Sequence, residues 1–94
     1  MGEGLTVAEP QVLMIDDEKQ VADAYALRLE GVADVAVAYG GEEGLAVVDD
    51  GRPPDVVLLD RHMPGYSGDE VLAELREREI MTRVIMVTAI DPDL

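Results

Sequence analysis

Three aspartates stand where their carboxylates could meet and hold a metal ion. Asp16 and Asp17 follow the apolar run Val12–Ile15, and Asp60 follows the apolar run Val56–Leu59. If these runs are neighbouring strands of one parallel sheet, all three carboxylates lie at its carboxyl edge, where open α/β sheets bind ligands. Acids that share a pocket repel each other, and a divalent cation with oxygen ligands relieves that repulsion. The pattern therefore predicts a Mg²⁺ site with a reactive aspartate.

Each of these residues also has an ordinary structural explanation. Asp16 and Asp17 could cap a helix that begins near Glu18, because acidic side chains favour helix N-termini. Capping needs only one acid, however, and it leaves Asp60 unexplained. Taken alone, Asp60 is a solvated strand end. The segment Gly40–Gly44 contains two glutamates that would repel a phosphate, so helix capping explains it better than a phosphate-binding loop.

The elements that would position the aspartates alternate along the chain. Four tetrads are apolar on both faces, which is typical of parallel strands covered on two sides, and helical periodicity predicts three helices between them. The expected strands are Val12–Ile15, Val35–Ala38, Val56–Leu59 and Val84–Val87, and the expected helices run from near Glu18 to Gly31, from Glu42 to Asp49, and onward from Ser67. This β-α-β-α-β-α-β order predicts an α/β fold with a parallel sheet and right-handed crossovers.

Side-chain spacing predicts which face of each helix is buried. The inward residues are expected to be Val21, Ala24, Tyr25 and Leu29 in the first helix, Leu45 and Val48 in the second, and Val71, Leu72 and Leu75 in the third. The third helix opens with a capping-box pattern in which Ser67 and Glu70 each bind the other's backbone N–H.

Composition limits the classes of function. The chain has 94 residues, no cysteine and a formal net charge of −14, so one small domain is expected and thiol chemistry is excluded. Strong negative charge opposes nucleic-acid binding through this domain. No apolar run is long enough to span a membrane, so a cytoplasmic protein is expected. A hydrophobic content of 48% beneath an acidic surface suits the high-salt cytoplasm of a halophile, because salt screens self-repulsion.

Three linked motifs resemble the receiver domains of two-component response regulators, the CheY-like domains of the histidine-aspartate phosphorelay. The motifs are Val12–Glu18, Asp60–Gly68 and Val87–Ala89, and the resemblance extends from Gln11 to about Ala89. It implies a flavodoxin-like sheet with strand order 2-1-3-4. It also implies a signalling module rather than a turnover enzyme, with a histidine kinase or phosphotransfer protein as partner.

The resemblance assigns roles in the acidic pocket. Asp60 is expected to accept the phosphoryl group, Asp17 to bind Mg²⁺ directly and Asp16 to reach it through water. The backbone carbonyl of His62 is expected to supply another oxygen, while its side chain is more simply a loop residue. Magnesium prefers about six oxygen ligands, several of them water.

The resemblance also assigns Thr88 and Ala89 to the phosphoacceptor site. Thr88 is expected to hydrogen-bond the phosphoryl oxygens, and the small Ala89 to leave room for the group. Taken alone, Thr88 is equally well explained as a β-branched strand residue.

The chain stops at Leu94, just past the fourth strand. We therefore expect a C-terminally truncated receiver domain at residues 11–94, after a flexible segment at residues 1–10. The family's fifth strand, its lysine and its last helices would be absent, and Lys19 follows the acidic pair too closely to replace that lysine. The fourth strand would then be a sheet edge, and a homodimer is a possible consequence.

Two alternatives to a phosphoacceptor remain open. A degenerate receiver would act only as a protein-interaction module. An aspartate-nucleophile phosphohydrolase is less favoured, because that class typically has a second acid two residues after the nucleophile, where this chain has His62.

Overall fold

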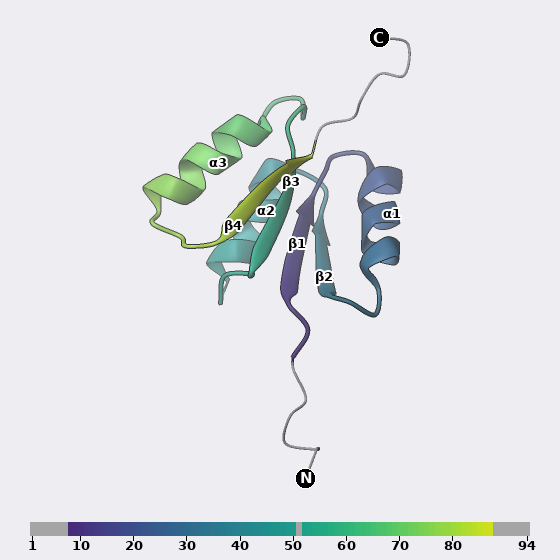
Figure 1. Ribbon diagram of the computed structural model, residues 1–94. Helices are drawn as coiled ribbons and strands as arrows, with labels where there is room; N and C mark the ends of the chain where they lie inside the picture. The colour runs from purple at the N-terminus through teal and green to yellow at the C-terminus, as the bar shows by residue number, and fades with distance from the viewer. Residues whose placement is uncertain (1–7, 51, 88–94) are drawn as a thin grey trace.

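Strands and helices alternate along the chain in the computed structural model, which describes residues 8–50 and 52–87 (Figure 1). The elements are β1 (Gln11–Ile15), α1 (Lys19–Leu29), β2 (Asp34–Ala38), α2 (Gly41–Asp49), β3 (Val56–Asp60), α3 (Gly68–Glu77) and β4 (Arg83–Val87). Each predicted apolar tetrad lies within one of these strands, so the predicted element order is confirmed. Most of the expected flexible segment, residues 1–7, lies outside the described residues.

The sheet is parallel throughout and has the order β2-β1-β3-β4. This is the order that the resemblance to receiver domains implies. In the register, Ile15 of β1 lies opposite Leu59 of β3. The next residues along the two strands, Asp16 and Asp60, therefore reach the same level of the sheet's carboxyl edge.

Helix α1 covers one face of the sheet, and α2 and α3 lie against the other (Figure 1). The largest group of buried side chains lies between the sheet and these two helices: Leu13, Ile15, Ala38, Leu45, Val48, Val57, Leu59, Met63, Val71 and Leu75. The expectation that all strands are buried on both faces is wrong for most of them. Only β1 is buried on both faces, because it contacts α1 on one face and α2 on the other. Strand β3 also has a neighbouring strand on each side, but β2, β3 and β4 all have half-buried or exposed positions.

The buried face of α1 differs from the predicted one. Ala22 is fully buried, whereas Ala24 is exposed and Val21, Tyr25 and Leu29 are only half-buried. The buried face of the helix therefore centres on Ala22, and the larger residues lie at its margin. None of the helices in the described part of the chain is long and apolar enough to cross a membrane.

Helices α2 and α3 follow the sequence signals closely. The Oγ of Ser67 accepts a hydrogen bond from the N–H of Glu70 at 3.2 Å, and the Glu70 carboxylate accepts one from the N–H of Ser67 at 3.3 Å. The capping box is therefore present as predicted. The expected inward side chains Leu45, Val48, Val71 and Leu75 are buried, and Leu72 is half-buried.

Candidate functional site

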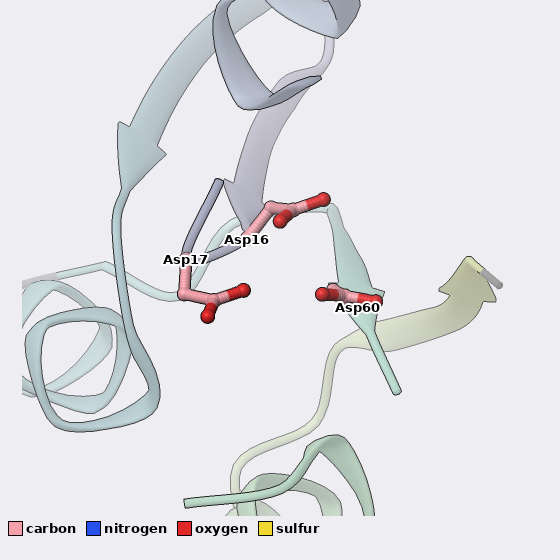
Figure 2. Close-up of side chains that lie close together, drawn as sticks. All are labelled: Asp16, Asp17 and Asp60. Carbon is pink, nitrogen blue, oxygen red and sulfur yellow. The ribbon is translucent and has the colours of Figure 1, made fainter. Parts of the chain in front are cut away.

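An acidic pocket lies at the carboxyl ends of β1 and β3. Asp16 and Asp17 directly follow β1, and Asp60 is the last residue of β3. Carboxylate oxygens of the three residues, one from each, all lie within 4.8 Å of one another. Figure 2 shows the carboxylates of Asp17 and Asp60 directed toward each other, with Asp16 beside them. The structure thus brings together the three aspartates that strand-end placement singled out.

Backbone contacts fix two of these carboxylates. The N–H of Asp16 donates to the carbonyl of Ala38 at 3.1 Å, and its Oδ1 accepts from the N–H of Glu18 at 2.9 Å. The Oδ1 of Asp60 accepts from the N–H of His62 at 3.3 Å. In each of these bonds to a backbone N–H, one of the two carboxylate oxygens is the acceptor.

The structure does not support the explanation that Asp16 and Asp17 cap α1. The N-cap residue of α1 is Glu18, its side chain makes no capping hydrogen bond, and the first turn of the helix contains no acidic residue. Asp16 instead binds the N–H that precedes the helix. Its buried position is therefore not explained by the needs of α1.

The electrostatics of Asp16 are unusual for an aspartate. Only 4% of its surface is exposed, and this burial is the main reason that its pKa rises from 3.8 to about 6. The charges of Asp60 and Asp17 raise the pKa further, whereas the hydrogen bond from Glu18 lowers it. Burial is therefore a larger cause of the raised pKa than the repulsion among the three acids.

Positive side chains near the pocket have other partners. Arg61 pairs with Asp69 at 3.6 Å, and the remaining ion pairs among residues 8–50 and 52–87 join Arg78 to Asp49 and Glu74. The Nζ of Lys19 lies 5.0 Å from the centre of the Tyr39 ring. The three aspartates therefore have no ion-pair partner within the part of the chain that the structure describes. Clustered carboxylate oxygens without a neighbouring cation are the donor set that a hard divalent ion such as Mg²⁺ prefers.

The structure describes only one of the remaining predicted site residues, His62. His62 is exposed, and its N–H faces the Asp60 carboxylate. Thr88 and Ala89 lie outside the described residues. The segment at Gly40 forms the start of α2, with Gly40 as the N-cap residue, as the capping interpretation predicts.

Packing of the loop after Asp60 involves residues whose role the sequence analysis did not identify. Gly68 begins α3 directly against the backbone of Asp60, and Tyr66 lies against Gly41 of α2. A capping-box pattern marks where α3 begins, but no local signal shows that a glycine is needed there for space.

Comparison with known proteins gives consistent results. The family described as "Response regulator receiver domain" matches residues 12–93. A Haloferax volcanii protein named "Putative transcriptional regulator" is 51% identical over 87 residues, which cover 92% of this chain and 15% of that protein. The chain thus spans a small part of that relative, whose halophilic source fits the origin expected from the acidic composition.

Solved structures agree in fold. The receiver domain of the Francisella response regulator 1452 is 34% identical, with a TM-score of 0.80 over 88% of this chain and 69% of that one. The N-terminal domain of a response regulator receiver protein from Methanoculleus marisnigri is 32% identical, with a TM-score of 0.77 over 92% of this chain and 73% of that one.

Proposed function

Because the chain belongs to the response regulator receiver domain family, whose members serve two-component signalling, we propose that Asp60 accepts a phosphoryl group in a Mg²⁺-dependent phosphorelay. The donor would be a histidine kinase or a phosphotransfer protein in the cytoplasm. The observation that carries this proposal is the approach of three carboxylates to within 4.8 Å of one another at the carboxyl edge of the sheet.

The reaction requires a nucleophile and an in-line approach. A carboxylate oxygen of Asp60 attacks the phosphorus of the donor's phosphohistidine, and an O–P bond forms as the P–N bond breaks. The electron pair of the broken bond stays on the imidazole nitrogen, and Asp60 becomes an acyl phosphate. The N–H of His62, which donates to Asp60 in this structure, would orient the attacking carboxylate.

Metal binding would fall to the other two aspartates together with Asp60. We propose that Asp17 binds the ion directly, that Asp16 reaches it through water, and that the carbonyl of His62 completes the protein's oxygen ligands. When bound, Mg²⁺ supplies charge neutralisation for the acids and the phosphoryl oxygens. Thr88 would hydrogen-bond the phosphoryl oxygens, and Ala89 would leave space for them.

Mass spectrometry after incubation with a small phosphodonor, such as phosphoramidate with Mg²⁺, tests the proposal. Wild-type protein should gain one phosphoryl group that hydroxylamine removes, and Asp60→Asn should gain none. Asp55→Asn is a matched control, because the Oδ2 of Asp55 accepts the N–H of Gln11 at 2.7 Å, at the opposite end of the sheet. Equal labelling of the Asp60→Asn variant would refute the assignment.

Labelling, beryllofluoride binding and phosphomonoester hydrolysis together separate the alternatives. A degenerate receiver would stay unlabelled and would not bind beryllofluoride with Mg²⁺, a mimic of the phosphorylated aspartate. A phosphohydrolase would release phosphate repeatedly from a generic phosphomonoester, whereas the proposed receiver would take up one phosphoryl group for each chain.

A further inference from the structure

The loop that follows Asp60 folds back so that α3 begins beside the end of β3. The N–H of Gly68 donates to the carbonyl of Arg61 at 3.1 Å, and the N–H of Arg61 donates to the carbonyl of Val87 at 3.3 Å. Arg61 and Asp69 also form an ion pair at 3.6 Å. The Gly68–Arg61 hydrogen bond and the Arg61–Asp69 ion pair close residues 61–68 into a loop whose two ends are adjacent, and the bond to Val87 ties this loop to β4.

This closure leaves no space for a side chain at position 68. A Cβ atom on Gly68 would lie 2.4 Å from the carbonyl oxygen of Asp60 and 2.8 Å from the Cα of Arg61. Both are backbone atoms, which cannot rotate out of the way. Any side chain at this position must therefore move either the first turn of α3 or the end of β3 that carries Asp60.

A second glycine holds the loop from the side of α2. A Cβ atom on Gly41 would lie 2.9 Å from Cδ1 of Tyr66 and 2.8 Å from Cγ2 of Val71. Tyr66 belongs to the loop, and Val71 is fully buried on α3. The loop is thus supported at Gly68 by β3 and at Tyr66 by α2.

We propose that Gly68 is a positioning residue for the acidic pocket, with Gly41 in a supporting role. By letting α3 begin against the backbone of Asp60, Gly68 sets the path of the loop. The loop in turn aims the His62 N–H at the Asp60 carboxylate, a contact of 3.3 Å. This inference rests on the proposed function, and it predicts that Mg²⁺ affinity depends on the absence of a side chain at position 68.

Titration calorimetry with Mg²⁺ tests the inference without any phosphodonor. Gly68→Ala should weaken Mg²⁺ binding by about tenfold or more, the range found when groups that orient metal ligands are changed. Gly41→Ala should act in the same direction with a smaller effect, because the atoms it meets belong to side chains that can shift. Measurements are made well below the Tm of each variant.

Two controls separate positioning from general loss of stability. A Cβ on Gly40 would meet nothing within 4 Å, so Gly40→Ala should bind Mg²⁺ like the wild type. Val48, on α2, is 2% exposed in the core, so Val48→Ala should lower the Tm while leaving the Mg²⁺ dissociation constant unchanged. The amide NMR resonance of His62 gives a metal-free readout, which should move in Gly68→Ala and stay in place in Val48→Ala.

Each outcome decides between two conclusions. If Gly68→Ala binds Mg²⁺ like the wild type, with a lowered Tm and an unmoved His62 resonance, Gly68 has only a structural role and the inference fails. If Gly68→Ala does not fold, the same comparison on Gly41→Ala decides. If wild-type protein does not bind Mg²⁺, the proposed metal site fails instead, and the His62 resonance still reports whether Gly68 positions the loop.

Discussion

Replacing Asp16 by asparagine should stabilise the metal-free protein at neutral pH. Asparagine retains the oxygen that accepts the N–H of Glu18 at 2.9 Å, but it removes a buried negative charge beside Asp60 and Asp17. Because burial raises the pKa of Asp16 to about 6 in the folded chain, ionising this group disfavours the folded state. The substitution removes that effect and keeps the shape of the side chain.

The magnitude follows from the two pKa values. Between the ordinary value of 3.8 and about 6 in the folded protein, the difference corresponds to at most about 3 kcal/mol in the free energy of unfolding. The pKa of Asp16 is higher in the folded protein than in the unfolded chain. Wild-type protein therefore has its full free energy of unfolding below about pH 4 and loses this contribution of Asp16 as the pH rises through about 6. For a domain of this size, a change of this order should alter the Tm by roughly 10 °C or more.

Thermal melts of wild type and Asp16→Asn, with a metal chelator present, should therefore agree near pH 4 and diverge as the pH rises to 7.5. As the pH rises, the general increase in negative charge affects both proteins. The difference between their Tm values therefore reports the effect of Asp16 alone. Asp50→Asn is a suitable control, because Asp50 is exposed at the end of α2 and should change stability by less than about 0.5 kcal/mol. Parallel melting curves at every pH would show that Asp16 is not destabilising when ionised, and the reasoning from burial would be wrong.

Further predictions concern the metal, the cap of α3 and self-association. At about 100 times its Kd, Mg²⁺ should raise the free energy of unfolding by about 2.7 kcal/mol, and Asp17→Asn should lose most of that increase in melting curves; an equal increase would contradict direct ligation. Ser67→Ala should cost about 1 kcal/mol in urea unfolding because it removes the capping box, and an unchanged urea midpoint would contradict that role. Strand β4 (Arg83–Val87) is the edge strand of the sheet, and its Ile85 is 52% exposed, so the 94-residue chain should dimerise through this edge. The dimer should become more stable as added salt screens the negative charge of the chain. Light scattering that shows a compact monomer at every salt concentration would refute this.

The sequence predicted the sheet and the meeting of the aspartates because both depend on periodic features. Apolar tetrads locate the strands, and the side-chain pattern fixes the strand ends at which Asp17 and Asp60 stand. Once β1 and β3 are neighbours in register, with Ile15 opposite Leu59, the proximity of the acids follows from geometry. The strand order itself came from resemblance to a family, since periodicity alone does not distinguish one arrangement of parallel strands from another.

Features that depend on how closely a helix packs against the sheet were harder to predict. Spacing in α1 predicts a face that contains Val21 and Tyr25, yet Ala22 is the only fully buried residue of the helix. A helical pattern weights residues by hydrophobicity, whereas close packing of a short helix can favour the smallest side chain. The degree to which Asp16 is buried could not be predicted for a related reason, because it depends on how tightly the neighbouring elements pack at the end of β1.

The loop after Asp60 shows the same limit at the site itself. In the sequence, Gly68 is one of several glycines and lies inside an ordinary capping pattern; nothing local separates it from Gly40, where a side chain would meet open space. What distinguishes Gly68 is the backbone of Asp60, eight positions earlier, which returns to within contact only when β3 and α3 have packed. The pocket therefore depends on two kinds of residue: carboxylates that offer oxygen atoms, which a sequence reveals by type, and a glycine that admits a neighbouring backbone, which only the folded chain reveals. Substituting the glycine should change the affinity of the carboxylates for Mg²⁺ without changing the carboxylates themselves. Titration of Gly68→Ala with Mg²⁺ measures this change in affinity.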